Sequence, residues 1–257
     1  DSSADHSGST HVLGAIFFTF QIYCDFSGYS DIALGTARLF GIELLRNFAF
    51  PYFSRDIAEF WRRWHISLSS WFRDYLYIPL GGSKGGTWMK VRNTFIIFIV
   101  SGFWHGANWT FIIWGLLNAL YIMPSVLFNT NRNNLDIVAQ GKYLPSMKEL
   151  LSIGITFCLT VFAWIFFRSA SLGEAISYIS EIFSRSLFTI PDIMPKTLFL
   201  FLILFLVIEW LGREQQYAIA NLGLKWPKAV RWATYYAIIS FMYYFGGSEQ
   251  QFIYFQF

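Results

Sequence analysis

Residues 101–108 read S-G-F-W-H-G-A-N and lie inside an apolar run, residues 93–128, that contains no Asp, Glu, Lys or Arg. Near the middle of this run stands a titratable side chain, His105. Twelve helical residues span ~18 Å, about halfway through a ~30 Å hydrocarbon core. An ionisable group at that depth is costly and therefore indicates a functional site. The alternative is a neutral histidine that is hydrogen-bonded to Ser101 or Asn108 on the same helix face.

The composition predicts an all-α polytopic membrane protein. The chain has 257 residues, of which 55% are hydrophobic, 21% aromatic and 14% charged, whereas soluble domains carry about 25% charged residues. So many aromatic side chains are typical of interfacial belts and of an apolar tunnel. Cys24 and Cys158 are expected to be packing thiols. The chain begins with Asp and shows no signal peptide, so we expect the C-terminal part of a longer protein.

Charge is distributed unevenly along the chain. Residues 38–92 hold nine Lys or Arg against four Asp or Glu, which indicates a cytoplasmic surface that could meet an anionic partner. The positive-inside rule also places residues 212–231 in the cytoplasm and residues 168–196 outside. Residues 93–128 are too short for two full spans, so we expect two short or re-entrant helices that meet near His105.

Two other segments carry polar residues. Residues 1–11 are expected to form a polar tail, with His6 and His11 in it or at the membrane edge. Residues 25–31 place Asp25, Asp31, two serines and a glycine within an apolar stretch. They predict either a broken helix that lines a cavity or a surface loop, and Asp31 could cap the following helix.

Residues 54–75 predict one amphipathic helix that lies in the membrane interface. Ser54 is a suitable N-cap, and the apolar residues form one stripe about 120° wide. The opposite face is charged, and tryptophans occupy the apolar side. His65 lies at the edge of the apolar stripe, where a histidine can be interfacial or functional. The residues of the two faces are Arg55, Glu59, Arg62 and Arg73, against Trp61, Trp64 and Trp71.

Four motifs in the first half of the chain together resemble the membrane-bound O-acyltransferase family. Within it, the resemblance is to the branch that contains the membrane subunit of bacterial alginate O-acetyltransferase. Residues 252–257 also resemble the end of that branch. The motifs are F-Q-I-Y-C-D-F-S-G-Y-S-D at 20–31, E-F-W-R-R-W-H-I-S-L-S at 59–69, W-F-R-D-Y-L-Y-I-P-L-G-G at 71–82 and S-G-F-W-H-G-A-N-W at 101–109.

The resemblance implies a ring of transmembrane and re-entrant helices around a central tunnel, in a multi-pass protein of the bacterial inner membrane. His105 matches the catalytic histidine of the family, and His65 matches its second characteristic histidine, which lies closer to the donor. The cytoplasmic mouth of the tunnel would take an acyl thioester and the other mouth an acceptor hydroxyl. Family members carry roughly as much chain again before the first motif, which this chain lacks.

Acyl transfer to a hydroxyl needs a general base and donors for the developing oxyanion. His105 is our candidate base, and Ser101, Trp104 or Asn108 could orient it or stabilise the oxyanion. Trp61 and Trp64 would support the tunnel beside His65. The phosphates of coenzyme A or of a carrier's phosphopantetheine could attract arginines, although such arginines can also be merely solvated, and Asp25 could orient a partner in the tunnel. The candidate arginines are Arg62, Arg63 and Arg73.

The expected partners are the bilayer, a thioester donor (coenzyme A or a carrier protein) and a periplasmic acetyltransferase or a polysaccharide. We expect no nucleic acid, no tightly bound cofactor and no metal, since His65 and His105 lack an obvious third ligand. A proton-coupled transporter or flippase that uses His105 with Asp25 and Asp31 would need no acyl donor. A non-catalytic membrane scaffold would not need His105.

Overall fold

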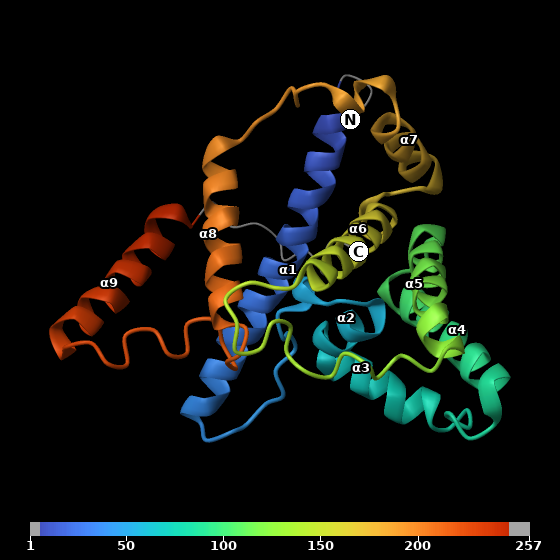
Figure 1. The fold of residues 1–257 in the computed structure, drawn as a ribbon, viewed down its shortest axis with the longest axis horizontal. Coiled ribbons are helices and arrows are strands. Elements are labelled where there is room, and N and C mark those ends of the chain that lie inside the picture. The colour runs from blue at the N-terminus through green and yellow to red at the C-terminus, as the bar shows by residue number, and fades with distance from the viewer. Residues whose placement is uncertain (1–5, 247–257) are drawn as a thin grey trace. The chain divides into compact units, whose positions relative to one another are not determined.

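A computed structural model describes residues 6–246, and every regular element within them is helical (Figure 1). The chain divides into two compact units, Asp1–Pro195 and Lys196–Phe257, which we describe separately. The first unit contains α1 (Gly8–Leu39), η2 (Pro51–Phe53), α2 (Ile57–Arg63), α3 (Ile66–Phe72), the π-helical turn η3 (Arg73–Tyr77), α4 (Gly86–His105), α5 (Trp109–Leu127), α6 (Met147–Arg168), α7 (Leu172–Ile182) and η4 (Arg185–Phe188).

Helix α1 is continuous, so the prediction of a break at residues 25–31 was wrong. Asp25 and Asp31 are both helical. Serine, glycine and aspartate lower helix propensity by less than about 1 kcal/mol each. That cost is offset here because α1 packs against α6 and α7.

The N-terminal polar segment is only partly a tail, because α1 already begins at Gly8. The Gly8 amide donates to Ser186 Oγ (2.8 Å), and the Ser7 amide donates to Asp192 Oδ2 (2.7 Å). His11, expected in the tail, is buried, and its ring lies edge-on to Tyr178. These contacts tie the start of α1 to the segment after α7.

The single helix expected over residues 54–75 is instead two short helices and a π-helical turn. Asp56, and not Ser54, caps α2 by accepting the Glu59 amide (2.7 Å). The chain leaves the helix at Trp64, which is extended, and at His65, which has a φ of 44°. The break persists because the Ile66 amide bonds to the Asn47 carbonyl instead of a helical partner (3.0 Å).

Helices α4 and α5 form a hairpin whose two backbones touch. A Cβ atom on Gly102 would lie 2.3 Å from the Phe111 carbonyl oxygen, and a Cβ atom on Gly115 would lie 2.3 Å from the Phe98 carbonyl oxygen. Small residues at such crossings are typical of helix packing in membranes. The hairpin turns between His105 and Trp109, where Asn108 caps α5 by accepting the Thr110 amide (3.2 Å).

Within the described residues, two helices are long and apolar enough to cross a membrane, α5 and α6. Ser146 and Glu149 form a capping box at the start of α6. The second unit contains α8 (Lys196–Gly212) and α9 (Lys228–Phe245). Phe201 of α8 lies edge-on to Phe241 and Phe245 of α9. The motif at residues 252–257 lies outside the described residues.

We expect Gly115→Ala to destabilise the hairpin, because its methyl group has no room beside the Phe98 carbonyl. Overpacking of this kind costs typically about 1–3 kcal/mol. Gly154→Ala in α6 is the matched control, since nothing lies within 4 Å of its Cβ position. Thermal unfolding of the two variants in the same detergent measures the difference. Equal melting temperatures would contradict the close α4–α5 contact.

Candidate active site

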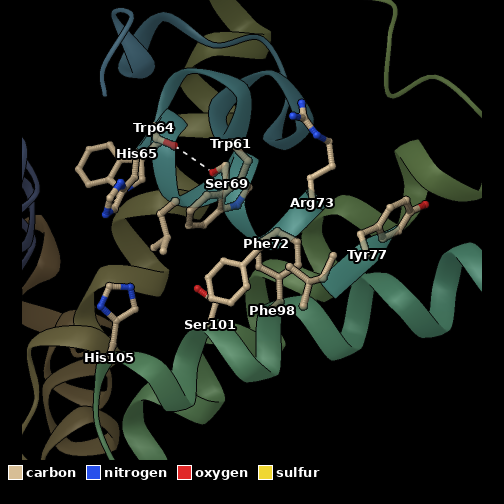
Figure 2. Close-up of a pocket in the computed structure, with 12 residues that line it drawn as sticks. Trp61, Trp64, His65, Ser69, Phe72, Arg73, Tyr77, Phe98, Ser101 and His105 are labelled. Atoms are coloured by element: carbon tan, nitrogen blue, oxygen red, sulfur yellow. Dashed lines mark hydrogen bonds between the residues drawn. The ribbon is translucent and has the colours of Figure 1, made fainter. Parts of the chain in front are cut away.

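His65 and His105 line one cavity of about 230 Å³. The cavity lies between the segment that runs from α2 to η3 and the helix α4, and Figure 2 shows the two imidazoles on opposite sides of it. Its wall is mostly apolar and aromatic. The lining residues are Trp61, Trp64, His65, Leu68, Ser69, Phe72, Arg73, Tyr77, Ile97, Phe98, Ser101 and His105.

His65 reaches this cavity because of the break between α2 and α3. Its left-handed backbone turns the chain between Trp64 and Ile66. Its ring lies edge-on to Phe26 of α1 (4.7 Å between centroids), and its Nδ1 lies 3.5 Å from Ser67 Oγ. Ser67 is itself held by Asn47, whose Oδ1 accepts from Ser67 Oγ (2.6 Å). The orientation of His65 is therefore fixed by groups on three segments.

His105 is the last residue of α4 and is enclosed by aromatic rings. Its ring centroid lies 4.9 Å from that of Trp104, 5.2 Å from that of Trp114 and 5.0 Å from that of Phe167, each nearly perpendicular to it. Ser101, one turn earlier, lies on the same side of α4 and lines the cavity too (Figure 2). Such a site is apolar around the imidazole but carries a hydroxyl close by.

The predicted site residues separate into two groups. Trp61, Trp64, Arg73 and Ser101 line the cavity together with the two histidines. Trp61 is held by Asn118, whose Oδ1 accepts from Nε1 (3.3 Å), and Trp64 is 2% exposed.

Asp25, Trp104 and Asn108 do not line the cavity. Asp25 lies within α1, and Trp104 packs on His105 but is 56% exposed. Both ends of the Asn108 amide serve the fold, since its Oδ1 caps α5 and its Nδ2 donates to the Ala170 carbonyl (2.8 Å).

Arg62 and Arg63 also lie away from the cavity. Arg62 donates to the carbonyls of Asn131 and Asn134 (2.6 and 2.8 Å), and Arg63 donates to Glu59 (2.8 Å). Both guanidinium groups therefore hold the loop of residues 129–146 or the helix α2. The prediction that the charged face of this helix is solvated was wrong, because that loop covers it.

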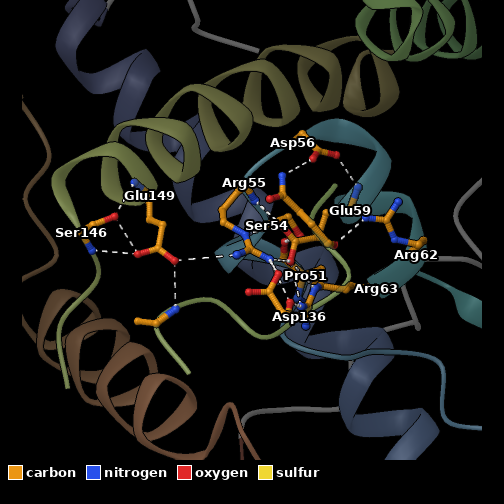
Figure 3. A network of polar contacts seen from close by, with 12 residues as sticks. Pro51, Ser54, Arg55, Asp56, Glu59, Arg62, Arg63, Asp136, Ser146 and Glu149 are labelled. Carbon is orange, nitrogen blue, oxygen red and sulfur yellow. Dashed lines mark hydrogen bonds and ion pairs between the residues drawn. The ribbon is translucent and has the colours of Figure 1, made fainter. Parts of the chain in front are cut away.

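At the centre of this network is the Glu59 carboxylate, whose side chain is 1% exposed. It accepts from Arg55 and Arg63, and Arg55 also pairs with Asp136 (3.0 Å) and Glu149 (3.7 Å), as Figure 3 shows. The hydrogen bond from Arg55 lowers the pKa of the Asp136 carboxyl. Burial alone would lower the pKa of Arg55, but its hydrogen bonds to the carboxylates outweigh that effect and raise the pKa. We name this set (Arg55, Glu59, Arg63, Asp136 and Glu149) the Glu59 network.

Sequence analysis missed the role of this network. The i, i+4 spacing of Arg55, Glu59 and Arg63 was a usable signal for helical ion pairs. The pairing with Asp136 joins residues 81 positions apart, which a single sequence does not reveal.

Arg73 remains the arginine beside the cavity. Its guanidinium pairs with Asp74 (2.7 Å), its side chain is 62% exposed, and this hydrogen bond raises its pKa. Among the described residues no group of three or more His, Cys, Asp or Glu side chains could hold a metal ion. What the cavity offers is two imidazoles and a hydroxyl in an apolar wall, with a cation at the edge. These groups can accept and donate protons around a buried polar centre.

Comparison with known proteins gives consistent matches. The MBOAT, membrane-bound O-acyltransferase family, matches residues 2–167. A probable alginate O-acetylase of Pseudomonas aeruginosa is 39% identical over 222 residues, which are 84% of this chain and 40% of that protein. A peptidoglycan O-acetyltransferase of Helicobacter pylori is 33% identical over 266 positions, 95% of this chain and 49% of that protein.

A teichoic acid D-alanyltransferase of Streptococcus thermophilus is 38% identical over 171 residues, 60% of this chain and 40% of that protein. The chain thus spans less than half the length of each of these relatives.

We expect Glu59→Gln to be strongly destabilising, because it leaves Arg55 and Arg63 without their shared buried carboxylate. Removing one partner of a buried ion pair costs about 3–5 kcal/mol. Asp74→Asn is the control, because it breaks the exposed pair with Arg73, and exposed pairs contribute ~0–1 kcal/mol. Denaturation in one detergent compares the two variants. A Glu59→Gln protein as stable as Asp74→Asn would contradict the network's importance.

The stability contributed by Asp136 should depend on pH. Because its pKa is lowered in the folded protein, the contribution is present above the ordinary value of 3.8 and is lost as pH falls through the lowered value. The melting temperature of the unaltered protein should exceed that of Asp136→Asn at neutral pH and at pH 4, and the difference should disappear below pH ~3. A difference that is already absent at neutral pH would contradict the Arg55–Asp136 pair.

Proposed function

The chain belongs to the membrane-bound O-acyltransferase family, and on that basis we propose that it is the C-terminal part of a membrane enzyme that transfers an acetyl group. The donor is a thioester in the cytoplasm, and the acceptor is a hydroxyl of an exported polysaccharide or of a periplasmic acceptor. The two O-acetylating relatives cover 84% and 95% of the chain and the D-alanylating one 60%, which favours acetyl as the group. The protein crosses the bacterial inner membrane several times.

The observation that carries this proposal is the shared cavity of His65 and His105. The two histidines lie 40 positions apart in the sequence, and both side chains line the same apolar wall. An acyl thioester is neutral at its reacting carbon, so an apolar cavity can hold it and exclude water, which would otherwise hydrolyse it. The cavity is then one stretch of a tunnel within a ring of helices completed by the remainder of the protein.

His105 acts as the general base in this proposal. It takes the proton of the acceptor hydroxyl while the hydroxyl oxygen forms a bond to the thioester carbonyl carbon. The C–S bond then breaks, and the leaving thiolate receives that proton, so the products are an acetyl ester and a thiol. The aromatic rings around His105 hold the imidazole in place, and Ser101 Oγ–H is close enough to the cavity to stabilise the oxyanion.

The donor is coenzyme A or the phosphopantetheine of a carrier protein. Arg73 can attract its phosphates, because it is exposed at the edge of the cavity and its ion-pair partner, Asp74, is an exposed carboxylate. Arg62 and Arg63 are left out of this role, because both are bound within the fold. His65 lies on the opposite wall from His105 and is placed to orient the donor carbonyl.

We expect His105→Ala in the full-length parent protein to lower acetyl transfer by about 10²- to 10⁴-fold, the usual contribution of a general base. The measurement is the transfer of radiolabelled acetyl groups in membranes that contain matched amounts of protein. His6→Ala is the control, because His6 lies outside the cavity. Full transfer by His105→Ala would contradict the catalytic role and would favour a scaffold.

A further inference from the structure

A second cavity of about 320 Å³ lies between α1, α6 and α7. We call it the α1–α6–α7 cavity. The described residues give it a mixed lining, with aromatic rings as well as charged and hydroxyl groups. Its lining residues are Ala15, Phe18, Trp164, Ile165, Arg168, Ser169, Glu174 and Tyr178. None of them lines the cavity of the two histidines.

One aromatic layer separates the two cavities. Trp164 lines the α1–α6–α7 cavity, and its ring centroid lies 5.2 Å from that of Trp64, which lines the histidine cavity. Phe167 forms a second connection, because it contacts both Trp164 and His105 at 5.0 Å. The α1–α6–α7 cavity is therefore linked to His105 through two rings, those of Trp164 and Phe167.

Two donors at this cavity lack hydrogen-bond acceptors in the described part of the chain. The Arg168 guanidinium lies over the Phe18 ring (5.2 Å) but has no hydrogen bond or ion pair there. Trp164 is 2% exposed, and its indole N–H has no hydrogen-bond partner among the same residues. A buried N–H without an acceptor costs about 1–3 kcal/mol, so a ligand acceptor would stabilise this arrangement.

The remaining polar groups are acceptors or can be. Glu174 Oε2 accepts the Ala170 amide (2.9 Å), and Tyr178 OH donates to the His11 carbonyl (2.7 Å), which leaves the phenol oxygen free to accept. Glu174 would repel an anion that came close to it, so an anionic group must sit on the Arg168 side. A sugar ring fits this mixture, since it has a C–H face for aromatic packing and a rim of hydroxyls for both donors and acceptors.

We propose that the α1–α6–α7 cavity binds the acceptor glycan through a sugar unit that carries a carboxylate. Arg168 pairs with the carboxylate, because a guanidinium binds carboxylates through two parallel hydrogen bonds. Trp164 supplies an aromatic face to the sugar ring, and its N–H donates to a sugar oxygen. The accepting hydroxyl then lies next to the Trp164–Phe167 layer, beyond which is His105. This inference rests on the proposed acetyl transfer.

The experiment uses the full-length parent protein in detergent and two fluorescent probes. One is a non-acetylated alginate oligosaccharide, whose units carry carboxylates, and the other is a neutral glucose oligomer of equal length. Fluorescence anisotropy measures binding at low and high salt. Arg168→Gln should weaken binding of the anionic probe by about 10- to 100-fold and remove most of its salt dependence. Arg168→Lys should recover part of the affinity.

Arg185→Gln is the matched control, because Arg185 lies in η4, outside this cavity, and should bind the anionic probe normally. Trp164→Phe, which keeps a ring but removes the N–H, should weaken binding of that probe several-fold. His105→Ala should bind it normally while transfer is lost. If His105→Ala transfers normally but Arg168→Gln loses the anionic probe, the proposed reaction fails and the glycan site stands.

The glycan site is overturned by any of three results. These are equal binding of both probes by the unaltered protein, no binding of either, and normal binding of the anionic probe by Arg168→Gln. If transfer still depends on His105 in those cases, the proposed reaction survives without this site.

Discussion

The buried carboxylate of Glu59 is the constraint on which the site depends. Helix α2 has seven residues, too few to be stable alone. Its two arginine partners neutralise the carboxylate and extend to the loop of residues 129–146 through Asp136. Because α2 is fixed in this way, its other face presents Trp61 and Trp64 to α5 and α6. The next residue, His65, is then left at the cavity wall.

A second constraint is the contact between α4 and α5. Gly102 and Gly115 let the two backbones touch, and this places Trp114 of α5 beside His105 at the end of α4. Trp164 of α6 stacks on Trp114 and also contacts Trp64. One aromatic layer thus joins three helices to α2. It fixes both histidines, and it divides the space on their two sides into separate cavities.

The sequence predicted the parts of this site better than their arrangement. His65 and His105 stood out because both lie in long motifs of the family, and the apolar run around His105 indicated burial. The family match itself is confirmed over residues 2–167. The roles of the individual residues stay predictions.

The errors came from contacts between distant segments. The polar residues at 25–31 do not break α1, because packing against α6 outweighs their low helix propensity. The helix over residues 54–75 breaks at Trp64 because Asn47 supplies a competing acceptor to Ile66. Arg62 and Arg63 looked solvated because nothing in their own segment shows that residues 131–136 will cover them. The most direct test of the central claim is a structure of the full-length parent protein with an unreactive acetyl-thioester analogue. The account predicts that the carbonyl carbon lies in the cavity between His65 and His105, and an analogue bound outside that cavity would contradict it.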